Sequence, residues 1–180
     1  RSARRGEYTA AADIAVRAFT HLGSFLEPSE RARLFDRVRT STMKPDPAEV
    51  IVAITDNRVV GSVVYNRPGT TDHPFLTAEW AFFRALAVDP AWAGQGIGRR
   101  LVGACIARAL CQDGDWIGLN AADVNEIAVR LYLRMGFVMV GDAFQNLGVA
   151  YRTYGLDLSK ESQGVRIPAP FNKDSQTSLR

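Results

Sequence analysis

Three glycines in alternate positions, followed at once by two arginines, are the residues of this sequence best suited to chemistry. Gly94, Gly96 and Gly98 precede Arg99 and Arg100. Glycine has no Cβ, so such a turn can adopt positive φ and bring main-chain amides close to an oxygen-rich ligand. The first N–H groups of a helix lack partners and lie at the positive end of the helix dipole. The spacing therefore predicts an anion site, for a group such as pyrophosphate, at the start of a helix.

A plain glycine turn with two solvated arginines is the alternative interpretation of the same residues. The dinucleotide pattern GxGxxG would require glycine at 99 or 101, where the sequence has Arg99 and Leu101. The Walker pattern would require glycine at 93 and lysine at 99, where the sequence has Ala93 and Arg99. The turn therefore matches neither of these two phosphate motifs.

The whole segment resembles motif A of the GCN5-related N-acetyltransferase (GNAT) family, which runs Val-x-Pro, a few residues, and then Arg/Gln-x-x-Gly-x-Gly/Ala. Here Val88-Asp89-Pro90 precedes Ala93-Gly94-Gln95-Gly96-Ile97-Gly98. In that family the turn holds the pyrophosphate of acetyl-coenzyme A (acetyl-CoA), and the backbone of the preceding strand pairs with the pantetheine arm. The resemblance implies cofactor contacts from Leu86, Ala87, Val88, Ala93, Gly94, Gln95, Gly96, Ile97, Gly98 and Arg99.

Ala93 departs from the family pattern, which usually has Arg or Gln at that position. Backbone amides, which any residue supplies, carry most of the phosphate contact in such a turn. We therefore expect a weaker hold on the cofactor and a retained site, with Gln95 or the two arginines compensating.

A second group of residues, from Leu119 to Phe137, resembles motif B of the same family, in which an Asn opens a helix, a Tyr lies within it and Gly-Phe follows. Asn125 and Tyr132 are seven residues apart, which is two helical turns, so both side chains are expected on nearly the same face. The resemblance implies that Asn125 contacts the cofactor and that the Tyr132 hydroxyl protonates the departing thiolate. A helix cap at Asn125 and a core aromatic at Tyr132 are the structural alternatives.

The general base, which must accept a proton from the attacking amine, is not singled out by the sequence. Some family members use a Glu on the strand before motif A, but Glu79 lies about 23 Å before Leu86 at the rise of a strand. His73 and Asp123 are loop candidates, and each has a solvated polar residue as its alternative interpretation. A chain of water molecules is the remaining route.

Composition and net charge limit which other classes of function the chain can have. The chain has 180 residues, 47% of them hydrophobic and 23% charged, which suits one soluble globular domain. The net charge of +3 is spread among carboxylates, so we expect no nucleic-acid partner. No apolar run has the length of a membrane span and no signal peptide is visible, so we expect no membrane partner and a cytoplasmic protein.

Histidine and cysteine usage argues against a metal site and a disulfide. The chain has two histidines, His21 and His73, and neither an HExxH nor a CxxC pattern, so no metal is expected. Cys105 and Cys111 lie on one expected helix, about 9 Å apart along its axis. That separation exceeds the reach of a disulfide, so both are expected as reduced core thiols.

Hydrophobic periodicity gives the elements that must position these residues. The expected helices are Ala10 to Phe19, Arg31 to Arg39, Ile97 to Cys111, and a segment from Asp123 to Gly136. The expected strands are a short edge strand within Ser2 to Tyr8, then Val50 to Thr55, Val59 to Tyr65, Glu79 to Val88, Trp116 to Ala121, Phe137 to Val140 and Ala150 to Leu158. In the strand before the turn, alternation places Trp80, Phe82, Leu86 and Val88 on one side and Phe83 on the other.

The resemblance implies an α/β fold of the GNAT acyl-CoA N-acyltransferase type, with a mixed, mostly antiparallel sheet flanked by helices, over residues 1–158. The tail, 159–180, is expected to be extended or disordered, or else to drape over the domain or a partner. The polar segments 23–47, 67–74 and 141–148 are expected to shape the acceptor pocket.

The implied reaction is transfer of the acetyl group of acetyl-CoA to a small-molecule or peptide amine by direct attack, with assembly as a homodimer left open. A non-catalytic acyl-CoA sensor with the same fold is the alternative. A basic nucleic-acid binder is a third possibility, which strongly salt-dependent affinity for DNA or RNA would reveal.

Overall fold

The computed structural model describes residues 1–43, 47–70, 77 and 79–159. The helices are η1 (Arg5–Glu7), α1 (Tyr8–Ala18), α2 (Thr20–Gly23), α3 (Pro28–Met43), η2 (Pro90–Trp92), α4 (Ile97–Leu110) and α5 (Glu126–Arg134). The strands are β1 (Glu49–Thr55), β2 (Arg58–Asn66), β3 (Ala81–Val88), β4 (Trp116–Ala122), β5 (Val138–Asn146) and β6 (Val149–Asp157). The expected tail beyond Ser159 and the candidate base His73 lie outside the described residues.

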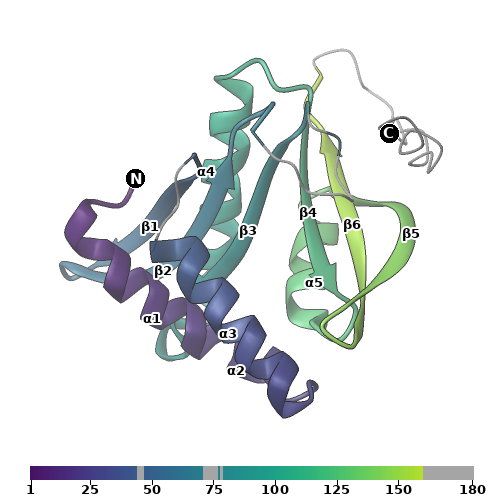
Figure 1. Cartoon of the computed structure of the whole chain (residues 1–180). Helices are drawn as coiled ribbons and strands as arrows, with labels where there is room; N and C mark the ends of the chain where they lie inside the picture. Colours follow the sequence, from purple (N-terminus) through teal and green to yellow (C-terminus); the bar gives the residue numbers. More distant parts are fainter. Residues whose placement is uncertain (44–46, 71–76, 78, 160–180) are drawn as a thin grey trace, which may run out of the picture.

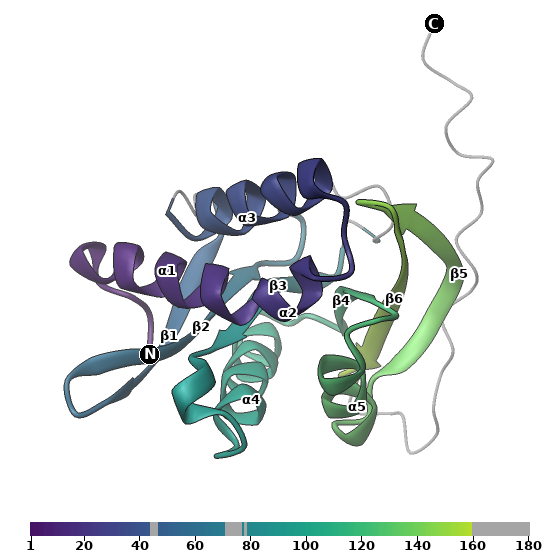
Figure 2. The ribbon, with the colours of Figure 1, turned by 90° about the horizontal axis from the view of Figure 1, so that it is seen from below.

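The six strands form one sheet with the order β1-β2-β3-β4-β6-β5. Helices α1 to α3 cover one face of this sheet, and α4 and α5 cover the other (Figures 1 and 2). Every neighbouring pair of strands is antiparallel except β3 and β4, which are parallel. The mixed, mostly antiparallel sheet flanked by helices is therefore confirmed.

The sheet splits between its two parallel strands. β3 and β4 pair only at Ala81 with Ile117 and at Phe82 with Gly118. Beyond these pairs the two strands diverge, as Figure 1 shows, while each stays paired with its other neighbour. Past this point the facing edges of β3 and β4 pair with no other strand of the described part of the chain, so backbone N–H and C=O groups beyond the bulge in β3 can reach a ligand.

A bulge in β3 changes which side chains face the split. Ala85 has a φ of +50°, and three residues of β3 pass opposite two of β2 at this point. The extra residue shifts the alternation, so Leu86 and Val88 lie on the same side as Phe83, which packs on Tyr132 of α5. The expected placement of Phe83 opposite Leu86 and Val88 was wrong, because strict alternation holds only in an unbulged strand.

Both faces of the sheet are buried. On the α4 and α5 side a core cluster includes Phe83, Leu101 and Tyr132. On the other side Ile14 of α1 and Leu34 of α3 belong to a second cluster. Two-sided burial explains why the central strands are predominantly apolar on both faces.

The expected edge strand at the N-terminus reduces to one isolated bridge between Ser2 and Ile51. The Glu7 carboxylate accepts the backbone N–H of Arg4 at 2.7 Å, and the chain turns into η1 and α1 from there. This local side-chain bond competes with strand pairing and favours a helix start.

The segment 141–148, expected as a polar loop, is mostly strand. β5 continues to Asn146, and the turn to β6 is the pair Leu147-Gly148, both with positive φ. β5 lies at the edge of the sheet, where one side of each strand faces solvent and polar residues are tolerated. The polar composition of residues 141–148 therefore predicted a loop, whereas pairing with β6 at the edge of the sheet makes most of the segment a strand.

The two cysteines differ in environment. Cys105 is buried in the core, and burial raises the pKa of its thiol. Cys111 is exposed, because α4 ends one residue earlier at Leu110, which is itself exposed. The prediction of a core position was wrong for Cys111.

Candidate active site

The glycine turn ends at the first turn of α4, as the sequence predicts. Gly96 is the N-cap of α4 with a φ of +75°, and no side chain caps the helix. The first helical backbone bond runs from the Arg100 N–H to the Gly96 carbonyl at 3.1 Å, so the amides before residue 100 have no partner within the helix. An ideal Cβ on Gly94 or Gly96 would meet no atom within 4 Å, so the space in front of the turn is open. This open cradle suits an anion such as pyrophosphate.

Gly98 serves a different purpose in the same turn. A Cβ at this position would lie 3.3 Å from the Leu131 Cδ2 atom of α5. The missing side chain therefore lets α4 approach α5 closely, and the two helices form adjoining walls of one pocket.

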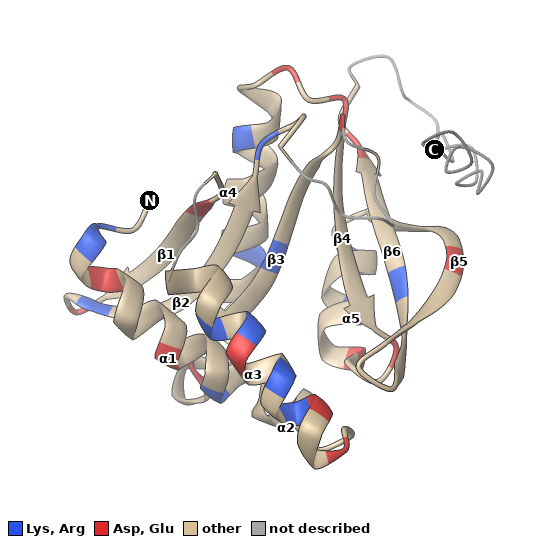
Figure 3. Ribbon diagram, viewed as in Figure 1, with Lys and Arg blue, Asp and Glu red and all other residues tan. Residues whose placement is uncertain are grey.

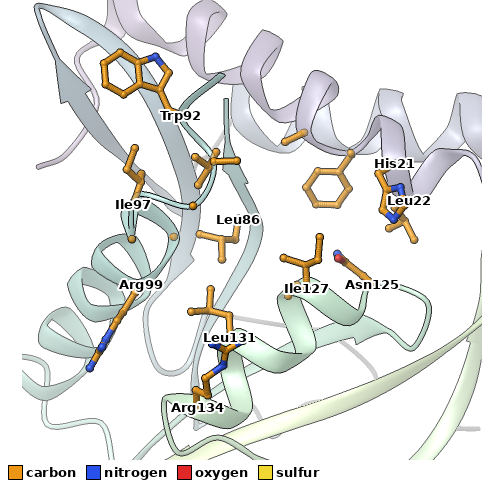
Figure 4. Close-up of a pocket in the computed structure, with 18 of the residues that line it drawn as sticks. His21, Leu22, Leu86, Trp92, Ile97, Arg99, Asn125, Ile127, Leu131 and Arg134 are labelled. Carbon is orange, nitrogen blue, oxygen red and sulfur yellow. The ribbon is translucent and has the colours of Figure 1, made fainter. Parts of the chain in front are cut away.

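That pocket has a volume of about 560 Å³ and lies where the sheet splits. Figure 4 shows Leu86 of β3 and Leu131 of α5 facing each other across it. Its lining residues are Ala18, Phe19, His21, Leu22, Leu86, Val88, Trp92, Ala93, Gly94, Gly96, Ile97, Gly98, Arg99, Asn125, Ile127, Ala128, Leu131, Arg134 and Met135. The volume is in the range of small-molecule sites, and one wall is the open edge of β3.

The pocket brings together nine of the twelve residues that the resemblance assigns to the site. They are Leu86, Val88, Ala93, Gly94, Gly96, Ile97, Gly98, Arg99 and Asn125. Ala87, Gln95 and Tyr132 are not among the lining residues. Ala87 packs on the opposite face of the sheet, and Gln95 is exposed with its carbonyl accepting from the Arg100 guanidinium at 3.1 Å.

Asn125 is held at the start of α5 without acting as a side-chain cap. Its backbone is not helical, with φ −89° and ψ 59°, and its side chain makes no capping hydrogen bond. The backbone carbonyl of Asn125 accepts the Val129 N–H at 3.0 Å, and this bond fixes Asn125 at the N-cap position of α5. The amide group is therefore directed to the pocket, which it lines (Figure 4).

Tyr132 lies deeper, on the side of α5 that faces the sheet. Its ring is 5.8 Å from that of Phe83 and 6.0 Å from that of Phe137, and the residue is 6% exposed. Burial raises the pKa of Tyr132, so the hydroxyl keeps its proton. Phe83 directly follows Phe82, the last residue of β3 that pairs with β4, so Tyr132 lies at the closed end of the split.

Asn125 and Tyr132 thus do not share one pocket wall. Asn125 precedes the first helical residue, so its side chain does not follow the rotation of α5. The expected two-turn relation between them applies only within a helix.

Charge in the pocket has one sign among the described lining residues. The charged residues there are Arg99 and Arg134, and the lining contains no Asp or Glu. A cleft lined by cations concentrates anionic ligands. Two cations beside an uncapped helix start therefore favour a phosphate-bearing ligand.

Of the candidate bases named from the sequence, Asp123 and Glu79 do not line this pocket, and His73 lies outside the described residues. Asp123 accepts the Arg152 Nε–H with both carboxylate oxygens, each at 3.1 Å. Glu79 is exposed and precedes β3 by two residues. His21 of α2 does line the pocket, and its ring contacts that of Phe25 at 5.2 Å.

Sequence reasoning missed His21 and most of the α5 wall. The short helix α2 has no motif that would single out His21. Ala128 and Leu131 of α5 and its C-cap Met135 follow each other at the three- and four-residue spacing of one helical face, which is the signal that could have identified them.

Within the described ranges, no three His, Cys, Asp or Glu side chains lie together in a way that could hold a metal ion. None of the helices in the described part of the chain has the length and apolar character needed to cross a membrane.

Comparison with known proteins addresses the fold. A structure of the yncA protein from Salmonella typhimurium with its cofactor acetyl-CoA has a TM-score of 0.64 at 17% identity, covering 90% of this chain and 94% of that one. Ribosomal-protein-alanine N-acetyltransferase from Brucella melitensis has a TM-score of 0.63 at 21% identity, covering 88% and 98%. YjaB from Escherichia coli has a TM-score of 0.62 at 26% identity, covering 87% and 94%.

Sequence comparison identifies the family. Among curated protein sequences none matches this chain significantly. The family model described as the acetyltransferase (GNAT) family matches residues 9–137, which is more than half of the chain and includes the glycine turn, the split and Tyr132. The chain therefore belongs to the GNAT acetyltransferase family.

Proposed function

We propose that this protein is an N-acetyltransferase that transfers the acetyl group of acetyl-CoA to an amine by direct attack. The observation that carries the proposal is the uncapped first turn of α4, which opens into a pocket walled by the unpartnered edge of β3. The free amides at a helix start bind phosphate oxygens. An open strand edge pairs with the amide groups of an extended ligand.

The pyrophosphate and the pantetheine arm of acetyl-CoA would each contact a different part of the pocket. The amides after Gly96, with Arg99 beside them, suit the pyrophosphate. Leu86 and Val88, on the edge beyond the bulge, would pair through their backbone with the pantetheine amides. Asn125 adds a hydrogen-bonding amide on the opposite wall.

Acetyl-CoA supplies the acetyl thioester: the amine nitrogen forms a bond to the carbonyl carbon, the carbon–sulfur bond breaks, and the products are an N-acetyl amide and the free thiol. The proton lost by nitrogen goes to water or to His21, which is the described lining residue able to accept one. The proton gained by sulfur comes from Tyr132, and the Tyr132 oxygen then takes back the proton released by nitrogen through water or His21, since burial favours the neutral hydroxyl.

The experiment is a panel of amines with acetyl-CoA, read by release of free thiol. The panel includes amino acids, a polyamine, an aminoglycoside and peptides with free N-termini. Turnover of any of them above the rate without protein supports the proposal, and absence of turnover for all of them contradicts it.

Gly96→Val tests the location of the donor site. A branched side chain at this position blocks access to the amides, so stabilisation against heat by acetyl-CoA should be lost. Gly141→Val is the matched control, because Gly141 has a similar φ of +72° against +75°, no atom within 4 Å of an ideal Cβ, and a place on the edge strand β5. Undiminished stabilisation of Gly96→Val would place the site elsewhere.

A non-catalytic acyl-CoA sensor is the second candidate. Ala93 at the family's Arg/Gln position favours it, since a sensor can release its ligand readily. A sensor would be stabilised by acetyl-CoA and sensitive to Gly96→Val, yet would release no thiol with any amine.

A further inference from the structure

An ion pair between Arg17 of α1 and Asp89, the residue after β3, borders the donor pocket. The Arg17 Nη2–H donates to the Asp89 Oδ2 atom at 2.7 Å, although the two residues are 72 positions apart in the sequence. The neighbours of both partners line the pocket: Ala18 and Phe19 follow Arg17, and Val88 precedes Asp89. The pair therefore joins two walls of the pocket at their edge.

Asp89 also holds the segment that leads into the glycine turn. Its other carboxylate oxygen, Oδ1, accepts the Ala91 N–H at 3.0 Å and so caps η2. The Asp89 N–H donates to the Val60 carbonyl of β2 at 2.9 Å, and the Asp89 carbonyl accepts the Trp92 N–H at 2.8 Å. Asp89 thus ties η2 to β2 through the main chain and to α1 through the side chain.

The segment from Pro90 to Gly96, which contains η2 and most of the glycine turn, has little buried surface. Trp92 is half-buried, and the other residues of the segment are exposed. A segment with few buried contacts has low local stability, so its position depends on the bonds that other elements make to it. The hydrogen bond from Arg17 to Asp89 is one of these bonds.

The pair lies between two sides of the same pocket. Figure 4 shows Trp92 of η2 on one side and His21 and Leu22 of α2 on the other. Because α2 follows α1 after one residue, the bond from Arg17 to Asp89 bears on the distance between these two sides. The same bond lowers the pKa of Asp89, so the carboxylate is charged near neutral pH.

We infer that Arg17 and Asp89 are positioning residues for the acetyl donor, and that their ion pair holds η2 and the glycine turn where the pocket accepts acetyl-CoA. Neither residue is among those that line the pocket, so the pair acts through the segments that it joins. Without it, acetyl-CoA would bind only the fraction of molecules in which the pocket is formed, and the apparent affinity would fall by that fraction. The inference rests on the proposed acetyl-CoA site and adds two residues to which neither motif assigns a role.

Asp89→Asn distinguishes positioning from long-range electrostatics by the direction of its effect. The asparagine side-chain oxygen can still cap η2, whereas the charge that holds Arg17 is removed. Acetyl-CoA is anionic, so the loss of a negative charge beside its site would by itself tighten binding. Positioning predicts the reverse: the dissociation constant of acetyl-CoA, measured by titration calorimetry, should rise about three- to fivefold, the most that an exposed ion pair contributes.

Three further variants test whether the two side chains act as one unit. Arg17→Gln should raise the dissociation constant by a similar factor, and Arg17→Lys, which keeps the charge, should stay within about twofold of the unchanged protein. In the double variant of Arg17→Gln with Asp89→Asn the two effects should not add, because either change breaks the same bond.

The ion pair of Asp13 on α1 with Arg39 on α3 is the matched control. It also joins α1 to another element, and the side chains of Arg39 and Arg17 are about equally exposed. Figure 3 shows charged residues of both signs on α1 and α3. Arg39→Gln and Arg17→Gln should each lower the melting temperature by less than about 4 °C, but Arg39→Gln should leave the dissociation constant unchanged.

The outcomes separate this inference from the proposed function. Unchanged or tighter binding by Asp89→Asn, with its folding verified by thermal unfolding, overturns the inference and leaves the donor site standing. Additive losses in the double variant, or an equal loss in Arg39→Gln, overturn it as well. If acetyl-CoA does not bind the unchanged protein, the proposed donor site fails and the inference fails with it. Should Asp89→Asn not fold, Asp89→Ser, which also caps a helix without a charge, takes its place under the same criteria.

Discussion

At the scale of single residues, Tyr132 joins a structural and a chemical role in one side chain. Its ring packs on Phe83 and Phe137, and its residue environment leaves only 6% of it exposed. Burial raises the pKa of Tyr132, so the hydroxyl stays protonated near neutral pH. A group in this state can donate to a developing thiolate but cannot act as a base near neutral pH.

Tyr132→Phe separates these two roles. The ring and its packing remain, so thermal stability and acetyl-CoA affinity should change little. We expect kcat and kcat/KM to fall together by about 10²- to 10⁴-fold, as for general-acid help given chiefly in the transition state. Steady-state kinetics with the best acceptor of the panel gives both values.

Tyr132→Leu, which removes ring and hydroxyl together, is the control for packing and should lose stability as well as activity. Retention of more than about half of kcat by Tyr132→Phe, with chemistry rate-limiting, would assign proton donation to solvent.

Ala93 is the residue at which this chain departs from its family's motif, and it lines the pocket beside the glycine turn. Ala93→Arg should add one charge-assisted contact to a phosphate and tighten acetyl-CoA binding by about 1 to 2 kcal/mol. The gain should shrink as salt is added, because exposed charge interactions are screened. Titration calorimetry at low and high salt measures both effects.

Ala91→Arg is the matched control for charge alone, because Ala91 is exposed and is not a lining residue. Equal tightening by both variants would show that the effect is long-range electrostatics and not a phosphate contact.

At the scale of elements, the position of α4 depends on a close approach to β2. An ideal Cβ on Gly61 would lie 3.0 Å from the Ala87 carbonyl oxygen and 3.1 Å from Ile97 Cγ2 of α4. Gly61→Ala should therefore displace the helix whose first turn forms the anion cradle. We expect a loss of about 1 to 3 kcal/mol in the free energy of unfolding, as for other overpacked sites, together with weaker stabilisation by acetyl-CoA.

Gly103→Ala, a change within α4 itself, should alter the free energy of unfolding in the opposite direction. Gly103 lies in the middle of α4, where an ideal Cβ meets nothing within 4 Å. Alanine there should raise the free energy of unfolding by about 0.5 to 1 kcal/mol through helix propensity. Urea unfolding of both variants measures the pair, and equal stability of Gly61→Ala and the unchanged protein would contradict the close approach.

At the scale of the whole molecule, an ion pair joins three parts that are distant in the sequence. Arg108 of α4 donates to both carboxylate oxygens of Glu49 on β1, at 2.8 and 2.9 Å, and Ser2 of the N-terminal segment donates to the same carboxylate. Burial by itself would raise the pKa of Glu49, but the hydrogen bonds from Arg108 and Ser2 outweigh it and the pKa is lowered. Hydrogen bonding by Arg1 likewise lowers the pKa of Glu7 to about 2.

A carboxyl group whose pKa is lowered in the folded state makes the protein more stable as pH rises. The carboxylate of Glu49 stabilises the fold above the unfolded pKa of about 4.3, and this contribution is lost as pH falls through the folded value. Glu49→Gln should therefore lower the melting temperature at pH 6 to 7, and the difference from the unchanged protein should shrink below about pH 4. Thermal unfolding between pH 3 and pH 7 measures the difference.

Glu126→Gln is the control, because its ion pair with Arg130 is exposed on both sides and such pairs contribute little. A difference for Glu49→Gln that stays constant with pH would mean that packing, and not charge, is what the substitution disturbs.

The sequence by itself determined the local features of the donor site. Whether a backbone can adopt positive φ depends on the residue alone, so Gly94 and Gly96 were identifiable, as was the helix that follows them. The connection between β1 and β2 is also a local feature, since Asp56 and Asn57 both adopt the positive φ that its two-residue turn requires. Helical period likewise located α1, α4 and α5, although their ends shifted by a few residues.

Only the tertiary structure decided which residues meet across the sheet. The bulge at Ala85 arises from pairing with β2 and reverses the faces of all residues after it, which no pattern within β3 reveals. The inclusion of His21 of α2 in the pocket likewise depends on contacts between segments far apart in the chain. Such contacts depend on register and strand order, which are set by the packing of the whole sheet between its two helical layers and not by any one segment.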